Sequence, residues 1–206
     1  MSAEQFHYEM KLRAAGFTAI AGVDEAGRGA LAGPLVVAAV VLDEQKEIPG
    51  LNDSKLISAK KRDELRKQID ERAVAISIVE ISASEIDQIG IAQADIQGMR
   101  RALARLTTKP DFVITDGFAV DGIDRPSLAM KKGDRLCASV AAASIVAKTH
   151  RDNLMRELDI EHPNYGLAIH KGYGTSQHLT ALREYGNSPI HRTSFIWDKS
   201  TGLEAS

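Results

Sequence analysis

Two patterns of apolar and polar positions divide the chain into predicted strands and helices. Short apolar runs rich in β-branched residues lie at 18–27, 33–42, 73–81, 111–117 and 127–134. The run at 33–42 is apolar at almost every position, which is typical of a strand buried on both faces. The connection between the first two runs is short and rich in glycine, so we expect these two strands to pair antiparallel.

Apolar residues at helical spacing predict the helices between and after these strands. The charged segment 57–73 has Leu65 and Ile69 on one helical face, and Ser82 and Glu85 form a capping box that opens a further helical region. We also expect a helix that ends before Pro110, one long helix over 134–159, and a helix at 176–185. The first half of the long helix is rich in Ala and Ser, which allows it to pack very close to a sheet.

These elements predict a single α/β domain over residues 1–206. Strands come first and strand–helix units follow, which favours a mixed sheet of about five strands with helices on both faces. The segment 160–206 is rich in loops, carries the helix at 176–185, and forms the C-terminal part of the domain.

The composition excludes several classes of protein. It is ordinary for a globular protein, with 44% hydrophobic and 26% charged residues. One cysteine, Cys137, allows no disulfide within the chain, which fits a reducing, cytoplasmic setting. No apolar run suits a signal peptide or a membrane span, so we expect no membrane partner.

The net charge of −2 means that a nucleic-acid partner would have to meet a local basic patch. The basic groups that can supply such a patch are Lys60-Lys61-Arg62, Arg100-Arg101, Lys131-Lys132 and His170-Lys171.

Four acids lie where the predicted strands and the long helix begin or end. Asp24 and Glu25 end the first strand, Asp116 ends the strand at 111–117, and Asp134 starts the long helix. Taken singly, each is explained by a turn or a helix cap. Taken together, acids at such places converge and would repel one another strongly. A hard divalent cation, Mg²⁺ or Mn²⁺, removes that conflict, and two such ions support phosphodiester cleavage.

A glycine-rich turn follows the first two acids. Gly27 and Gly29 allow the backbone to approach a ligand closely, so that its donors and acceptors can read a sugar 2′-hydroxyl, and Arg28 can bind a phosphate. The competing interpretation is a hairpin turn with a surface arginine.

The motifs GVDEAGRG…LAGP, LNDSK, ITDG, KKGD…AAASIVAKTHRD, HKGYGTSQH and SPIHRTSF occur in this order between about Ala19 and Phe195. In content and spacing they resemble bacterial ribonuclease HII over nearly the whole chain. The related ribonuclease HIII shares the core but usually carries an N-terminal extension. Here the first acid is already at position 24, so the type II enzyme fits better.

The resemblance implies an RNase H-like fold and a metal-dependent endonuclease. Its partners would be RNA–DNA hybrids, in which it cleaves the RNA strand, and duplex DNA with a single embedded ribonucleotide, which it incises on the 5′ side to leave 5′-phosphate and 3′-hydroxyl ends. Such incision belongs to ribonucleotide excision repair.

The resemblance also assigns residues. The catalytic and metal-binding acids would be Asp24, Glu25, Asp116 and Asp134. The loop Gly27, Arg28, Gly29 would sense the ribonucleotide, and Tyr173 would pack on the next sugar, with 160–206 completing the substrate site. Ala30 stands where the family commonly has Pro, which softens the loop but leaves its functional groups intact.

Two other functions remain open from the residues. One is a nucleic-acid-binding module that has kept the fold without the chemistry, against which the complete set of four acids argues. The other is a DNA nuclease on the same fold, in which the Gly-Arg-Gly loop and Tyr173 would have no ribose to read. We expect a monomer, and 200–206 shows no clear motif for binding a sliding clamp.

The remaining candidates have structural interpretations. Tyr165 is expected to be structural, and Ser144 with Lys148 is expected to serve packing and a phosphate contact, because their spacing is not that of a Ser-x-x-Lys nucleophile. The loop Asp53-Ser54-Lys55 either contacts the nucleic-acid backbone or caps a helix. Nothing marks His7 as a ligand or a base.

Overall fold

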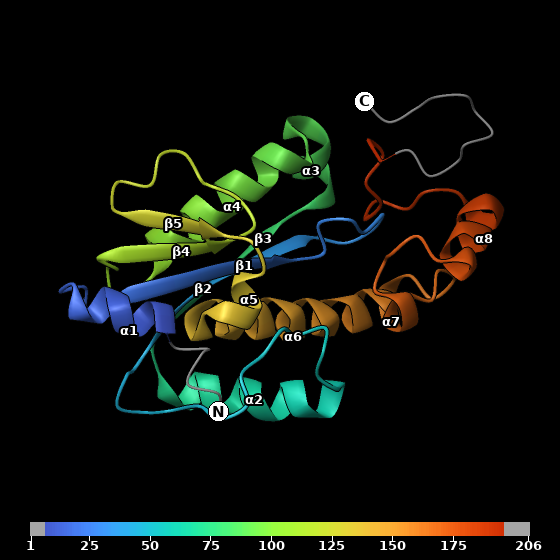
Figure 1. Ribbon diagram of the computed structural model, residues 1–206. Coiled ribbons are helices and arrows are strands. Elements are labelled where there is room, and N and C mark those ends of the chain that lie inside the picture. Colours follow the sequence, from blue (N-terminus) through green and yellow to red (C-terminus); the bar gives the residue numbers. More distant parts are fainter. Residues whose placement is uncertain (1–6, 196–206) are drawn as a thin grey trace.

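The computed structural model describes residues 7–195, and the tail at 200–206 lies outside them. A five-stranded sheet in the order β3-β2-β1-β4-β5 forms the centre (Figure 1). Strands β1 (Ile20–Ala26) and β2 (Leu35–Leu42) pair antiparallel, as the short glycine-rich connection predicted, and β3 (Ala73–Ile81) pairs antiparallel with β2. Strands β4 (Phe112–Asp116) and β5 (Ser127–Met130) continue the sheet in parallel with β1. The predicted mixed α/β fold is therefore confirmed.

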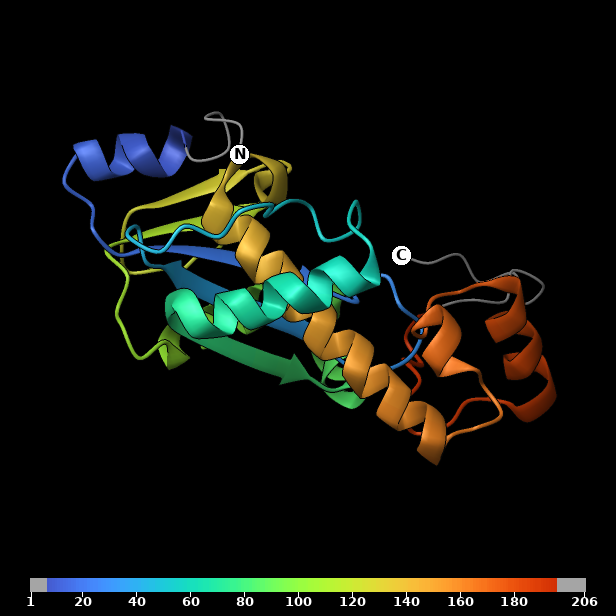
Figure 2. The same cartoon turned by 90° about the horizontal axis from the view of Figure 1, so that it is seen from below.

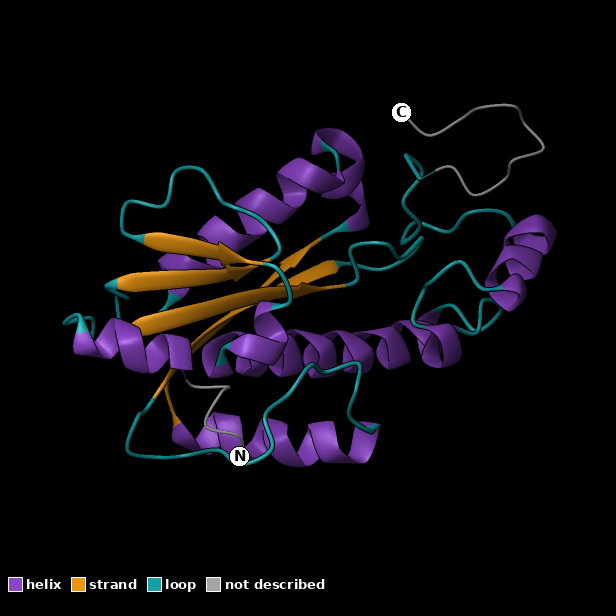
Figure 3. Cartoon of the chain, in the orientation of Figure 1, coloured by secondary structure: helices purple, strands orange, loops and turns teal. Residues whose placement is uncertain are grey.

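Helices cover both faces of this sheet. Helices α3 (Ala83–Ile89) and α4 (Ile91–Arg105) lie on one face, with the Ser82 hydroxyl accepting from the Glu85 amide as the predicted capping box requires. Helix α6 (Ala138–Glu161) lies on the other face, and α2 (Ala59–Arg72) crosses it (Figure 2). Helix α1 (His7–Ala14) packs beside the start of β1, in view in Figure 3. The apolar side chains of the strands fill both layers.

Helix α6 approaches β1 to backbone contact, and Gly22 is the reason. A Cβ atom on Gly22 would lie 2.1 Å from the carbonyl carbon of Ser139 and 2.3 Å from the amide of Val140. The facing stretch of α6 is rich in Ala and Ser, with Ser139 at the contact, which lets the helix backbone lie so close. The predicted role of this small-residue stretch is thereby confirmed.

The expected long helix over 134–159 is wrong in one respect, because Cys137 divides it. A short helix α5 (Gly133–Leu136) comes first, Cys137 is extended with φ −128° and ψ 126°, and α6 starts at Ala138. The α6 terminus is satisfied from 130 residues away, since the Ser139 amide and hydroxyl both donate to Glu9 Oε1, at 3.0 and 2.9 Å. Asp134 consequently lies on a turn of its own rather than on the main helix.

The C-terminal segment is joined to the β1–β2 connection by backbone hydrogen bonds. It contains α7 (Leu167–His170) and the predicted α8 (Ser176–Tyr185), at the far end of α6 (Figure 1). Leu31 donates to Gly172, Arg192 donates to Leu31, and Ala32 forms a bridge with His191. Among residues 7–195, no helix is long and apolar enough to cross a membrane.

Substituting Gly22 tests the close contact between α6 and β1. Gly22→Ala should lower the free energy of unfolding by about 3 kcal/mol or more, because the backbones of both elements would have to separate. Gly29→Ala is the matched control, since a Cβ there meets nothing within 4 Å. Urea unfolding of both variants measures the difference, and equal stability of the two would contradict the packing described.

Candidate active site

Two of the predicted acids are brought side by side by strand pairing. β1 and β4 are parallel neighbours with Val23 opposite Thr115, so Asp24 and Asp116 follow at the same edge of the sheet. Successive strand residues point to opposite faces. Asp24 therefore faces α6, where Ser144 partly opposes the effect of burial on its pKa, and Glu25 faces α4.

The third element of the cluster is attached through Asp116. Asp116 Oδ1 accepts a hydrogen bond of 2.7 Å from the amide of Gly133, which fixes the start of α5 at the end of β4. Asp134 is the next residue and is buried. The structure thus brings together the four acids predicted from the sequence.

Burial and the charges of neighbouring carboxylates raise the pKa of Asp24, Glu25 and Asp134. Burial raises the pKa of Asp24 well above its ordinary value, and the charges of Glu25 and Asp116 raise it further. The pKa of Glu25 is raised by burial, against the lowering effect of Arg28. Burial, Asp53 and Asp116 raise the pKa of Asp134 to about 6. Like charges this close to one another disfavour ionisation of the carboxyl groups, and a bound cation would remove that repulsion.

The donor set fits a hard divalent cation. All four side chains offer carboxylate oxygens, and Glu25 Oε2 is buried without a hydrogen-bond partner among the described residues. In residues 7–195, no three His, Cys, Asp or Glu side chains already stand close enough to one another to ligate an ion. Ion binding would therefore draw the carboxylates together.

The loop Asp53-Ser54-Lys55 lies beside this cluster. Asp53 Oδ2 accepts from Arg135 Nη2 at 2.9 Å, and the hydroxyls of Ser54 and Ser144 are 2.9 Å apart. Burial works to lower the pKa of Lys55, but the charges of Asp24 and Asp53 are among those that leave it raised. Lys148 pairs with Asp152 at 2.6 Å. The loop thus contacts the candidate site instead of only capping a helix.

The Gly27-Arg28-Gly29 loop is supported by two buried arginines. Gly27 has φ +91°, and a Cβ there would lie 1.9 Å from Arg151 Nε. Arg192 Nη1 donates to the Arg28 carbonyl at 2.8 Å. Gly29 is open to approach, and the amide of Ala30 donates to Gly27 at 3.2 Å, a bond that a proline could not make.

Arg28 has an acidic neighbour that the sequence analysis missed. Its Nε lies 3.2 Å from Asp95 Oδ2, and its guanidinium lies 5.4 Å from the ring centre of Phe118. Asp95 is fully buried, and burial followed by the charge of Glu25 raises its pKa to about 7. The signal was an acid on the buried face of α4, between Ala94 and Gly98.

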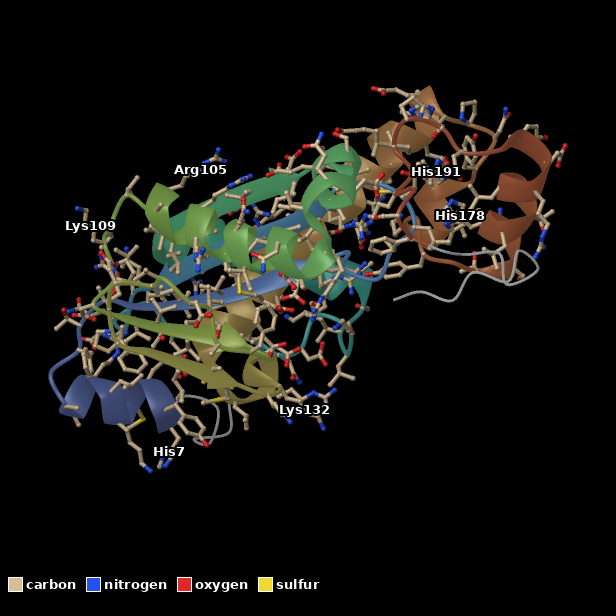
Figure 4. All side chains as sticks on the ribbon, turned by 90° about the horizontal axis from the view of Figure 1, so that it is seen from above. His7, Arg105, Lys109, Lys132, His178 and His191 are labelled. Atoms are coloured by element: carbon tan, nitrogen blue, oxygen red, sulfur yellow. The ribbon has the colours of Figure 1, made fainter. Side chains whose placement is uncertain are left out.

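The remaining candidate residues differ in their exposure and in their distance from the acids. Tyr173 is 38% exposed with Arg151 5.5 Å from its ring centre, whereas Tyr165 is buried and donates to Gly186 O, as expected of a structural residue. Figure 4 shows His7 at the opposite end of the molecule from His178 and His191. Of the basic groups, Lys131-Lys132 directly precede α5, while Arg100 and Arg101 bond to Asp121 and Glu85.

A mixed sheet with acids at the ends of neighbouring strands is the architecture of a ribonuclease H-type hydrolase, and solved structures agree. The ribonuclease H2 of Pyrococcus horikoshii OT3 is 27% identical with a TM-score of 0.74, covering 86% of this chain and 94% of that one. A structure of the PCNA:RNase HII complex from Archaeoglobus fulgidus is 25% identical with a TM-score of 0.75, covering 85% and 94%.

Sequence comparisons specify the family. The Ribonuclease HII family model matches residues 21–197. The ribonuclease HII of Cutibacterium acnes is 52% identical over 91% of this chain and 93% of its own, and that of Mycobacteroides abscessus is 48% identical over 96% and 86%. The chain belongs to the ribonuclease HII family. Members of this family are endoribonucleases that act on RNA–DNA hybrids, and so is this protein, which excludes the non-catalytic module. The family match also confirms the assignment to type II rather than type III.

Adding a divalent cation should stabilise the protein through the acids. In chelator, the free energy of unfolding should fall as pH rises from about 4 through 6, because the folded protein retains protons on its raised carboxyls that the unfolded chain has released. At neutral pH, Mn²⁺ at 100 times its dissociation constant should restore about 2.7 kcal/mol. Asp24→Asn should be more stable than the unchanged chain in chelator and should gain less from Mn²⁺. An equal gain in both proteins would remove Asp24 from the metal site.

Replacing Asp95 tests whether it orients Arg28. Asp95→Asn keeps the shape of the side chain and removes the charge, so it should raise KM for a hybrid substrate and leave folding intact. Arg28→Ala should have a similar effect, and the double variant should be no worse than Arg28→Ala, because contacting residues are not additive. Steady-state kinetics of the three variants provide the measurement. Effects that simply add would show that Asp95 acts independently of Arg28.

Proposed function

We propose that the protein is a divalent-metal-dependent endonuclease that also incises duplex DNA on the 5′ side of a single embedded ribonucleotide, leaving 5′-phosphate and 3′-hydroxyl ends. The observation that carries the proposal is the cluster of acids at the ends of β1 and β4, where the charge of Asp116 raises the pKa of both Asp24 and Glu25. Evolutionary relatives named ribonuclease HII, from several bacteria, support it.

Asp24, Glu25, Asp116 and Asp134 would hold the metal, as Mg²⁺ or Mn²⁺. When bound, two such ions supply an activated water and stabilisation of the leaving oxygen. A solved ribonuclease HIII structure that shares the fold is described as a complex with Mn²⁺. The chain itself contributes the arrangement, because the Gly133 amide donates to Asp116 and the Glu25 amide donates to Asp24.

Substrate recognition would be the role of the Gly27-Arg28-Gly29 loop and Tyr173. The open backbone at Gly29 can approach a 2′-hydroxyl, and the half-exposed guanidinium of Arg28 can bind a neighbouring phosphate. The Tyr173 ring would pack on the next sugar, where an added hydroxyl would collide. The strand would then be cut preferentially at a step from RNA to DNA.

The segment 160–206 would complete this substrate site within a single domain of 1–206. Within the described part of that segment, Arg192 donates to the Arg28 carbonyl and Gly172 accepts from Leu31, so the recognition loop and Tyr173 are held on one framework. Removing the segment would leave the loop without these supports.

Cleavage of three labelled duplexes tests the proposal. The substrates carry one ribonucleotide in DNA, an all-RNA strand on DNA, and DNA only, with Mg²⁺, Mn²⁺ or chelator. We expect cleavage of the first two duplexes with metal and none of the third. A site that hydrogen-bonds a hydroxyl discriminates against a substrate that lacks the hydroxyl by roughly 10⁴-fold or more. Asp116→Asn should abolish turnover, while Asp121→Asn, at an acid on the loop between β4 and β5, should not. Full activity in chelator would refute metal dependence.

The same assay tests Tyr173. Tyr173→Ala should strongly reduce cleavage at the single ribonucleotide and weaken the preference for the RNA-to-DNA step, with a smaller effect on the all-RNA strand. Tyr8→Ala is the matched control, because Tyr8 is 37% exposed against 38% for Tyr173 but lies on α1. Unchanged rates and ordering for Tyr173→Ala would show that this ring does not sense the sugar.

A further inference from the structure

Three buried histidines stand behind Tyr173, and neither the metal cluster nor the recognition loop uses their side chains. His178 is fully buried, His191 is 3% exposed, and their Nε2 atoms are 3.1 Å apart. The ring of His170 stacks on His178 with the centroids 4.4 Å apart. Figure 4 places His178 and His191 together inside the C-terminal segment.

Backbone groups fix which nitrogen of each ring carries the proton. The amide of Ser188 can only donate, and it points at His191 Nδ1 from 3.0 Å, so this nitrogen must be bare and the proton must be on Nε2. The carbonyl of Tyr173 can only accept, and His178 Nδ1 lies 3.1 Å from it, so His178 must carry its proton on Nδ1. His178 Nε2 is then bare and accepts from His191 Nε2.

The two assignments agree, which makes the arrangement a directed chain of hydrogen bonds. It runs from the Ser188 amide through His191 and His178 to the Tyr173 carbonyl. Both rings must be neutral, since a second proton on either would set two donors against each other. Burial lowers the pKa of His191 to about 4, with His178 adding to the effect, and burial also lowers the pKa of His178.

The chain joins the two elements assigned to ribose recognition. His191 bridges Ala32 through its backbone, and the next residue, Arg192, donates to Arg28 in the recognition loop. At the other end, the Tyr173 carbonyl accepts from His178 and from the Thr175 amide at 2.8 Å, while the Tyr173 amide donates to His170 O. The backbone of Tyr173 is thereby held while its ring stays free to meet a sugar.

We propose that His178 and His191 are positioning residues that set Tyr173 at a fixed place relative to the Gly27-Arg28-Gly29 loop, through a hydrogen-bond chain with defined proton positions. This rests on the proposed role of Tyr173 in recognising the sugar beyond the ribonucleotide. The pair acts through the tyrosine backbone and does not touch the substrate.

Nitrogen-15 NMR of the full-length protein with labelled histidine tests the series of hydrogen bonds independently of any activity. At pH 7, His178 should show its proton on Nδ1, and His191 should show its proton on Nε2, with neither ring charged. A charged ring, or the opposite tautomer at either residue, would overturn the proposal even if the cleavage assay supports the role of Tyr173.

Variants of His178 test the positioning role. His178→Leu removes the donor to Tyr173 and should reduce cleavage at a single ribonucleotide by about tenfold, the rate equivalent of one buried hydrogen bond. Combined with Tyr173→Ala, it should cause no further loss. His178→Asn places an amide NH₂ near the lost Nδ1–H and should recover part of the activity and of the preference. His150→Gln, at a half-buried histidine on α6 that bonds Glu80 on β3, is the control.

The outcomes separate the two proposals. If Tyr173→Ala has no effect in the unchanged chain, the role of the tyrosine fails while the NMR result still decides the hydrogen-bond chain. If His178→Leu and Tyr173→Ala reduce the rate independently, or if His178→Asn performs no better than His178→Leu, the positioning role is overturned. Should His178→Leu fail to fold by urea unfolding, His178→Asn and the tautomers in the unchanged chain still give the answer.

Discussion

The contact between α6 and β1 at Gly22 is the constraint on which the candidate site depends. Asp24 lies two residues beyond Gly22 and therefore on the same face of the strand. Because the helix reaches backbone contact at Gly22, it also closes over Asp24, which is buried. A larger residue at position 22 would separate the two layers, let water reach Asp24, and relax its electrostatic strain. Packing of small residues thus determines the ionisation behaviour of a carboxylate.

The candidate site places negatively charged groups where their charge lowers the stability of the fold. Burying carboxylates beside one another lowers stability, and only part of the loss is offset, by Lys55 beside Asp24 and Arg28 beside Glu25 and Asp95. Groups arranged this way are common where a bound cation or substrate supplies the missing charge. The surrounding layers are apolar and closely packed, with both faces of the sheet covered, and this packing offsets the loss of stability at the acids.

Sequence patterns were sufficient for the sheet, for most helices and for the four acids, because these follow from local periodicity and from strand ends. They were insufficient where the local structure involves a contact with a residue far away in the sequence. The break at Cys137 lies next to a distant contact, since Glu9 on the first helix accepts from the Ser139 amide at the start of α6. The pairing of Asp95 with Arg28 requires the register of α4 against the loop, and the proton positions of His178 and His191 require the directions of backbone donors. Each is a tertiary contact with no period in the sequence.

The Gly27-Arg28-Gly29 loop is held by two buried arginines that have no acidic partners among the described residues. Arg151 donates to the carbonyls of Pro34, Lys171 and Ala32, and Arg192 donates to those of Gly33 and Arg28. Within residues 7–195 neither forms an ion pair with a carboxylate, so their charge is satisfied by dipoles and is not neutralised. Carbonyl partners fix the loop geometry, since every donor of a planar guanidinium has a set direction. They also leave a positive field beneath the loop, which explains how a chain with a net charge of −2 can present a favourable surface to phosphates beside its own cluster of acids.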